Sequence, residues 1–195
     1  MKPAKRTANR GPSSRRRRSA KTSGRGGAAS TINLLVIVDA TDASRGAVQY
    51  SGRIAARVAA IECHLACIVP RLPPELLESG GSELPRREEQ IESDLWLEQQ
   101  RWTATIEKEA NRTLRAARAT LERAGVASGR IHTRVWSPSD ASTAVDDVLL
   151  LARDAGCQTV VVGHQAHPWF RGLGAGHLAE QLVRTAKGLA VWVIG

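Results

Sequence analysis

The stretch "INLLVIVDA" (residues 32–40) is an almost continuous apolar run, rich in β-branched side chains, that ends at an aspartate and an alanine. An uninterrupted apolar run of this length is typical of a strand that is buried on both faces, as in a parallel sheet. Thr41, Asp42 and Ser44 follow it, and short polar side chains of this kind favour the start of a helix. The sequence therefore predicts a buried strand followed directly by a helix.

The alternation of strand and helix patterns continues along the rest of the chain. We expect a helix over residues 44–60 with Ala47, Ile54 and Val58 on its inner side, and a strand over residues 62–69. The later elements are a helix from Arg86 to about Ala124, strands at 130–136, 158–163 and 189–195, and helices at 145–156 and 176–188. This order predicts one α/β domain over residues 31–195, with a doubly wound, five-stranded parallel sheet.

The long helix from Arg86 carries apolar side chains at helical spacing. One face of it is expected to hold Ile91, Leu95, Trp102, Ile106, Thr113 and Ala117. We expect Trp96 and Trp102 to pack into the core, with a partner interface as the alternative, and the mixed charges of the helix to lie on its solvated side.

Residues 1–30 have a different composition from the rest of the chain. They hold ten of the 28 Lys and Arg residues and no acidic residue, whereas residues 31–195 are close to neutral, so the net charge of +9 belongs to this tail. A segment with so few large apolar residues is predicted to be a disordered basic tail. A second interpretation stays open, in which the tail binds nucleic acid or another anionic partner.

The cysteines and the hydropathy indicate the compartment. Cys63 and Cys67 fall on one face of an expected strand, roughly 13 Å apart, which is too far for a disulfide. With Cys157 they are expected to be buried thiols in a reducing compartment. Because no apolar run reaches the ~18 residues of a membrane span, we expect a cytoplasmic protein.

The glycine-rich stretch "VVVGHQAHPWFRGLGAGHLAE" (residues 160–180) lacks the Lys-Ser/Thr of a P-loop and does not stand in a dinucleotide-binding context. Gly176 is expected to start a helix, whose free N–H groups favour an anion, and Gly163 and Asp39 are expected at the same sheet edge. His164, His167 and His177 lack the Cys or carboxylate partners of a strong zinc signal, so no metal site is predicted. No catalytic triad can be identified by spacing, so no catalytic residue is predicted.

Two spaced patterns resemble those of the universal stress protein family. The first comprises Val38-Asp39-Ala40-Thr41, Ser44 and Ala47; the second is Gly163, two residues, Ala166, nine residues and Gly176-His177. The resemblance covers residues 31–195. It implies the adenine nucleotide alpha hydrolase-like fold, a five-stranded sheet with strand order 3-2-1-4-5.

The resemblance also implies a site for ATP, with Mg²⁺ accompanying the nucleotide as the one metal. By position, Asp39 would contact the nucleoside and Val69 would line the adenine pocket. The glycine loop that would hold the phosphates comprises Gly163, Ala166, Gly176, His177 and Leu178. Two residues depart from the family pattern: Ala166 stands where a glycine is usual, and His177 where a small hydroxyl is usual. Two outcomes therefore stay open: a nucleotide sensor, or a loop that kept its fold and lost its ligand.

The function implied by the resemblance is regulatory or protective, in the stress response. The chain is expected not to be an enzyme, or at most a slow ATPase. A homodimer is expected through the apolar last strand "AVWVIG", since an unpaired edge invites pairing with its copy. The alternative is a nucleic-acid or anionic-partner binding protein that acts through residues 1–30, with the domain as a dimerising scaffold.

Overall fold

The computed structural model describes residues 31–77, 85–138, 142–164 and 178–195. Its centre is a sheet of five parallel strands in the order β3-β2-β1-β4-β5. The strands are β1 (Ile32–Ile37), β2 (Ile61–Ile68), β3 (Ile131–Trp136), β4 (Thr159–Gly163) and β5 (Ala190–Ile194). The predicted doubly wound α/β class and the strand order 3-2-1-4-5 are both confirmed.

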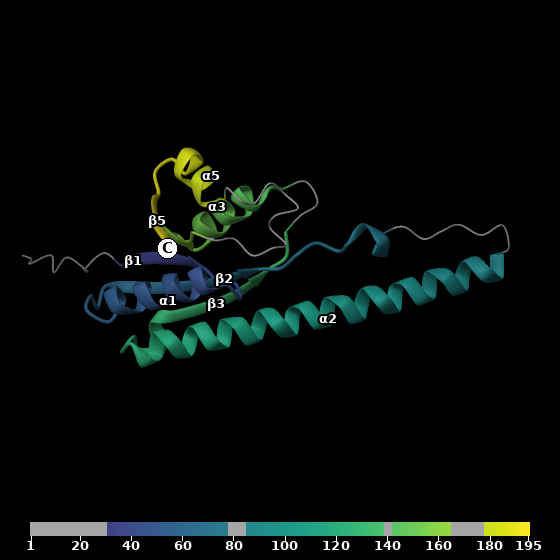
Figure 1. The fold of residues 1–195 in the computed structure, drawn as a ribbon, viewed down its shortest axis with the longest axis horizontal. Helices are drawn as coiled ribbons and strands as arrows, with labels where there is room; N and C mark the ends of the chain where they lie inside the picture. The colour runs from purple at the N-terminus through teal and green to yellow at the C-terminus, as the bar shows by residue number, and fades with distance from the viewer. Residues whose placement is uncertain (1–30, 78–84, 139–141, 165–177) are drawn as a thin grey trace, which may run out of the picture.

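Helices cover both faces of the sheet, as Figure 1 shows. Helices α1 (Asp42–Ala55) and α2 (Pro85–Arg123) lie on one face, and α3 (Ala144–Asp154) and α5 (Leu178–Thr185) lie on the other. Two short 3-10 turns, η1 (Pro74–Leu76) and η2 (Ser128–Arg130), precede α2 and β3. This arrangement follows from the crossovers, because each right-handed βαβ unit places its helix on a face of the sheet.

Two hydrophobic cores hold these layers together, one on each side of the sheet. Alternate residues of β1 divide between them: Leu34 and Val36 face α1 and α2, whereas Leu35 and Ile37 face α3 and α5. All four side chains are buried. The uninterrupted apolar run at residues 34–38 is explained by this double burial, since this part of a central parallel strand has no solvent face.

Helix α1 is shorter than the sequence pattern predicts. It ends at Ala55, and the N–H of Ile61 bonds to the carbonyl of Val58 in the turn that leads into β2. Val58, predicted to face the core, is therefore exposed. The sequence pattern predicted a longer helix because residues 56–60 hold three more alanines, which extend the helical pattern. The chain must turn before β2 starts at Ile61, so the helix ends earlier.

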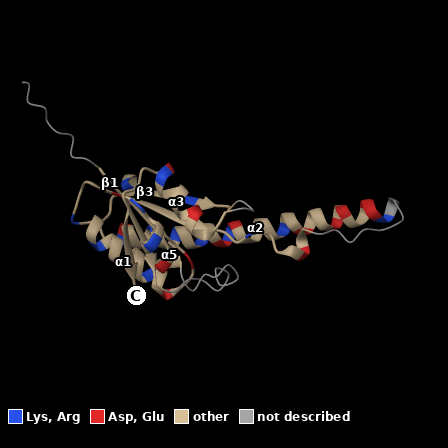
Figure 2. Cartoon of the chain, turned by 90° about the horizontal axis from the view of Figure 1, so that it is seen from above, with Lys and Arg blue, Asp and Glu red and all other residues tan. Residues whose placement is uncertain are grey.

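Helix α2 begins and ends within one residue of the predicted positions, but only part of its apolar face is covered. Its buried residues are Ala110, Leu114, Ala117 and Leu121, all in its second half. The first half projects beyond the sheet, as Figures 1 and 2 show, and carries charges of both signs. Trp96 is 57% exposed there, so the expected core packing of Trp96 is wrong, and Trp102 is half-buried.

Cys63, Cys67 and Cys157 are buried free thiols, as predicted. In the described part of the chain, no helix combines the length and the hydropathy that crossing a membrane requires. The predicted tail of residues 1–30 lies outside the described residues.

Candidate functional site

Four of the seven site residues predicted from the resemblance lie at the carboxyl edge of the sheet or directly beyond it. Asp39 follows β1, Val69 follows β2, Gly163 ends β4 and Leu178 begins α5. The other three, Ala166, Gly176 and His177, lie outside the described residues, as does His167. In doubly wound sheets, ligands bind at this carboxyl edge, where the strand order reverses, here between β1 and β4.

The carboxylate of Asp39 organises the turn between β1 and α1. Its Oδ1 accepts hydrogen bonds from the backbone N–H of Thr41 at 2.8 Å and from the Thr41 hydroxyl at 2.5 Å. Thr41 is the N-cap of α1, and its Oγ1 accepts a bond from the N–H of Ser44. The Ser44 hydroxyl in turn accepts a bond from the N–H of Asp39 at 2.9 Å. Asp39 is thus held in place, and none of the described residues donates a hydrogen bond to its second oxygen.

Gly163 brings the end of β4 against the first turn of α1. A Cβ added to it would lie 2.7 Å from the carbonyl carbon of Ala43 and 2.8 Å from the nitrogen of Ser44. These are backbone atoms, which cannot move aside as a flexible side chain can. The glycine is therefore required by packing within the fold, which is a sufficient reason for it without a ligand.

A cavity of about 830 Å³ opens between α1 and α2, over the ends of β1 and β2. It has the size of pockets that hold cofactors and small ligands. On the sheet side it is lined by Val38, Asp39, Ala40, Cys67, Ile68, Val69 and Pro70. From α1 come Ser44, Arg45, Val48 and Gln49, and α2 supplies a wall that runs from Ile106 to Arg123.

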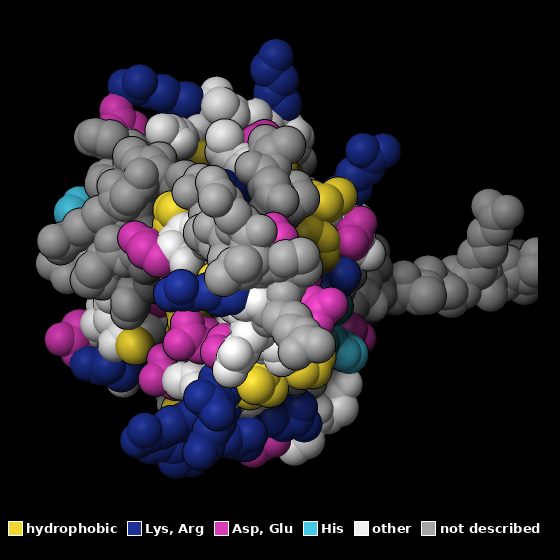
Figure 3. Space-filling model, turned by 90° about the vertical axis from the view of Figure 1, so that its right-hand side faces the viewer, with side chains coloured by type: hydrophobic (Ala, Val, Ile, Leu, Met, Phe, Trp, Pro, Cys, Tyr) yellow, Lys and Arg dark blue, Asp and Glu magenta, His cyan; other side chains and the backbone are white. Residues whose placement is uncertain are grey.

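The cavity combines an apolar floor with a polar rim. Val38, Val48 and Val69 are buried, whereas Arg45 and Arg112 are exposed at its margin. Arg45 donates to the carbonyl of Ala40 at 3.1 Å and pairs with Asp42, so its guanidinium stays near the start of α1. Figure 3 shows the side of the molecule that lies on the right in Figure 1, where basic and acidic side chains lie close together.

The resemblance identified the sheet side of this cavity but not its helical wall. Asp39 and Val69 line it as predicted, whereas Gly163 is not among its lining residues. The wall residues Ile106, Glu109, Thr113 and Thr120 were missed as site residues. The sequence did place Ile106 and Thr113 on the predicted apolar face of this helix. Spacing alone, however, does not distinguish a core contact from a cavity wall.

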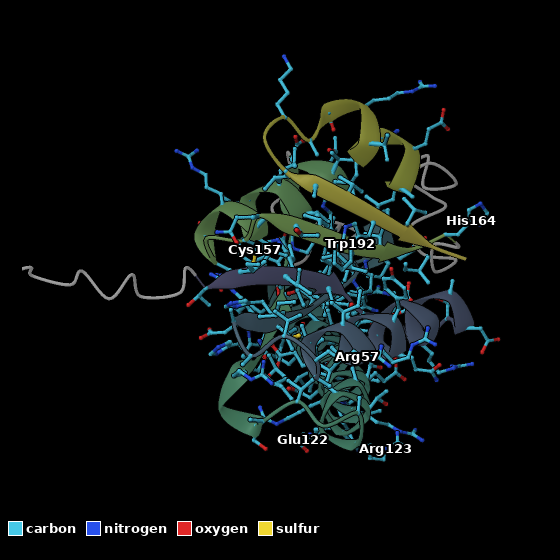
Figure 4. All side chains as sticks on the ribbon, turned by 90° about the vertical axis from the view of Figure 1, so that its left-hand side faces the viewer. Arg57, Glu122, Arg123, Cys157, His164 and Trp192 are labelled. Atoms are coloured by element: carbon cyan, nitrogen blue, oxygen red, sulfur yellow. The ribbon has the colours of Figure 1, made fainter. Side chains whose placement is uncertain are left out.

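The backbone beyond β4 is described only as far as His164. The N–H of His164 bonds to the carbonyl of Ile194 at 2.6 Å, which fixes this residue beside the end of β5, as Figure 4 shows. At the far side of the 165–177 segment, Leu178 is buried against the core under α3 and α5. The described residues thus fix both ends of the predicted phosphate loop. The contacts of this loop with phosphate stay a prediction.

The fold and the cavity define a class: a doubly wound α/β protein with a ligand-sized cavity beside the end of its first strand. Within that class, the chain belongs to the universal stress protein family, whose family model matches residues 32–194. The resemblance inferred from the sequence is confirmed.

Solved structures show the same fold at low sequence identity. A protein of the universal stress protein family from Burkholderia pseudomallei is 20% identical, with a TM-score of 0.56, and the match covers 83% of this chain and 94% of that one. A universal stress protein in complex with cAMP is 18% identical, with a TM-score of 0.52 and coverages of 84% and 97%. The universal stress protein from Archaeoglobus fulgidus in complex with dAMP is 15% identical, with a TM-score of 0.50 and coverages of 84% and 98%. No curated protein matches the chain.

Proposed function

We propose that this chain is a regulatory protein of the stress response that binds an adenine nucleotide, ATP first among them, as a sensed ligand. The observation that carries the proposal is the cavity of about 830 Å³ with Asp39 and Val69 on its sheet side. Family membership adds support, since two structurally similar universal stress proteins were solved with cAMP and dAMP.

The chemistry of the cavity suits a nucleoside. Val38, Val48 and Val69 offer an apolar surface for a purine, and the free oxygen of Asp39 can accept hydrogen bonds from ribose hydroxyls. The phosphates would then point toward the 163–178 segment, where Gly163, Ala166, Gly176, His177 and Leu178 are the proposed contacts. No general base is proposed, so the ligand would be bound and sensed, with hydrolysis slow at most.

The test is the unfolding stability of the full chain with and without millimolar ATP and Mg²⁺, supported by calorimetry. A ligand that binds only the native state stabilises it by about 2.7 kcal/mol at a hundredfold excess over its Kd. Thr113→Trp should abolish this stabilisation, because the indole would fill the cavity from the α2 wall. Thr105→Trp is the matched control, since Thr105 is exposed on the same helix and does not line the cavity.

A second variant separates binding from folding. Asp39→Asn keeps an oxygen that can accept the bonds from Thr41, so the turn should survive, while the charge that favours the ribose hydroxyls is lost. We expect the nucleotide affinity to fall at least about tenfold, with stability little changed. If the wild-type chain shows no stabilisation by ATP, AMP or cAMP, the proposal is wrong.

The proposed homodimer would form through β5. This strand is an edge of the sheet, and its Val193 is 38% exposed. Val193→Arg should convert a dimer to a monomer in light scattering, since a charge on the edge opposes pairing. Ile32→Arg is the control, because Ile32 is equally exposed but begins an interior strand. A dimer that survives Val193→Arg would place the interface elsewhere.

The second candidate function, binding of nucleic acid, is favoured by the ten basic residues and the absence of acid in residues 1–30. Replacing Arg15, Arg16, Arg17 and Arg18 by Gln in the full chain should weaken binding to duplex DNA and flatten its salt dependence. Affinity and salt dependence equal to those of the wild type would exclude the tail as the binding element.

A further inference from the structure

A second cluster of functional side chains lies away from the cavity, on the outer part of the sheet. Glu62 and His64 are two residues apart on β2, so they point to the same face, and His132 pairs with His64 in the register of β2 and β3. This is the face that carries Ala66 and Ile68 and is covered farther along by α3 and α5. The nucleotide cavity lies on the opposite face, so this cluster is independent of the proposed function.

The three side chains are close enough to share one ligand. The Nε2 of His132 lies 3.0 Å from a carboxylate oxygen of Glu62, and the rings of His64 and His132 stack with centroids 4.6 Å apart. One donor atom from each residue can be chosen so that all three lie within 4.8 Å of one another. Among the described residues, no other group of at least three His, Cys, Asp or Glu side chains has this geometry.

His64 has an unsatisfied nitrogen in this cluster. Its Nε2 is buried and has no hydrogen-bond partner among the described residues. A buried polar atom without a partner costs free energy, so each such atom in a native fold calls for an explanation.

The cluster is also open to solvent on one side. The side chains of His132 and Glu62 are 47% and 36% exposed, so an ion from solvent can reach two of the three side chains directly. The nearest basic residue along the same face of β3, Arg134, is engaged elsewhere. Its guanidinium stacks on Trp136 at 4.7 Å and reaches Asp154 of α3 at 3.5 Å.

We propose that Glu62, His64 and His132 bind a divalent transition-metal ion of the Zn²⁺ class. Imidazole nitrogens and a carboxylate oxygen are a donor set that such ions prefer, at bond lengths of about 2.0–2.2 Å. Ligand atoms around a tetrahedral ion lie roughly 3.4 Å apart, and the Glu62–His132 pair, hydrogen-bonded at 3.0 Å, needs to open by only a few tenths of an ångström to reach this spacing. A fourth position is left for water.

Binding requires one local rearrangement and the displacement of the proton that His132 Nε2 and Glu62 share in their hydrogen bond, which passes to the other ring nitrogen or to solvent. Stacked imidazoles aim their lone pairs side by side, so the rings of His64 and His132 must turn about their side-chain torsions to converge on one ion. His132 is at the exposed edge strand and has room for this movement. The site was missed in the sequence because only the loop histidines were considered, and the pairing of His64 with His132 depends on strand register.

The test is titration of the tag-free full chain with Zn²⁺ by calorimetry, and with Co²⁺ by its visible absorption. We expect one ion per chain, and a loss of affinity of at least about tenfold in each of His132→Gln, Glu62→Gln and His64→Gln. The matched control is His164→Gln with His167→Gln, which removes two histidines of the 164–177 segment and should change the affinity less than twofold.

Each result decides the proposal. Wild-type affinity in the His132→Gln and Glu62→Gln variants, loss of binding in the loop control, or no binding of either ion to the wild type would overturn it. His132 and Glu62 are both partly exposed, so these two variants are expected to fold even if His64→Gln is unstable. Circular dichroism of each variant establishes whether it is folded before it is titrated.

Discussion

Gly163 at the end of β4 and Ser44 in the first turn of α1 are in backbone contact. A Cβ on Gly163 would lie 2.8 Å from the Ser44 nitrogen, closer than a real Cβ comes to a backbone atom. The same Ser44 nitrogen donates to the N-cap Thr41, and the Ser44 hydroxyl accepts from Asp39. The end of the fourth strand and the turn that carries Asp39 are therefore one packed unit.

Gly163→Ala should destabilise the domain by about 1–3 kcal/mol, because the added methyl group must push α1 away from β4. Urea denaturation measures this. Gly129→Ala is the control, since a Cβ there meets nothing within 4 Å, and its effect should stay within about 0.5 kcal/mol. Equal stability of the two variants would mean that α1 moves freely relative to β4.

Thr41→Ala should cost about 1 kcal/mol of stability, because the N-cap oxygen that accepts from Ser44 is lost and Asp39 loses a donor. Thr105→Ala is the comparison. Thr105 lies in the interior of α2, where its hydroxyl only bonds back to the carbonyl of Arg101, and alanine is the better helix former. A loss in Thr105→Ala as large as in Thr41→Ala would contradict the capping role.

Leu121→Ala should destabilise the domain by about 2–5 kcal/mol, since Leu121 is 0% exposed where α2 packs on the sheet. Leu97→Ala, on the projecting half of the same helix, should change stability by less than about 0.5 kcal/mol, because Leu97 is 41% exposed. Thermal or urea unfolding gives both values. A large loss in Leu97→Ala would show that the projecting half is covered in solution, for example by a second copy.

The cysteines should be unreactive in the native protein. Burial raises the pKa of Cys63, Cys67 and Cys157 to about 11, and the thiolate is the form that attacks disulfide reagents. A thiol assay at pH 8 should detect almost no reaction in buffer and three thiols in denaturant. Ser93→Cys, exposed on α2, should add one thiol that reacts at once. Fast reaction of the native wild type would contradict the burial.

The same shift predicts a loss of stability at alkaline pH. Thiols of the unfolded chain ionise near pH 9, whereas those of the folded chain stay protonated until about pH 11. Above pH 9 the unfolded state therefore releases protons that the native state keeps, and the free energy of unfolding falls as the pH rises toward 11. Cys67→Ala should reduce this slope in urea denaturation at several pH values. An unchanged slope would assign the alkaline loss to other groups.

The sequence by itself determined the secondary structure and the class of fold. The apolar runs at 34–38 and 160–162 are typical of strands that are covered on both faces, so they predict a layered parallel sheet. The spaced residues from Val38 to Ala47, with Gly163 downstream, identified the family and the sheet side of the cavity. These features are local in the sequence or occur at fixed spacing, so they can be recognised from the sequence alone.

Only the tertiary structure decided how surfaces of different elements meet. The apolar positions of α2 form one continuous stripe in the sequence. In the structure its second half both packs in the core and forms the wall of a cavity, whereas its first half projects with Trp96 exposed (Figure 1). Gly163 suggested a ligand, and the structure places the backbone of α1 against it. The cluster of Glu62, His64 and His132 exists because β2 and β3 pair in one register. Contacts between residues 70 apart depend on register and layer packing, which no local pattern encodes.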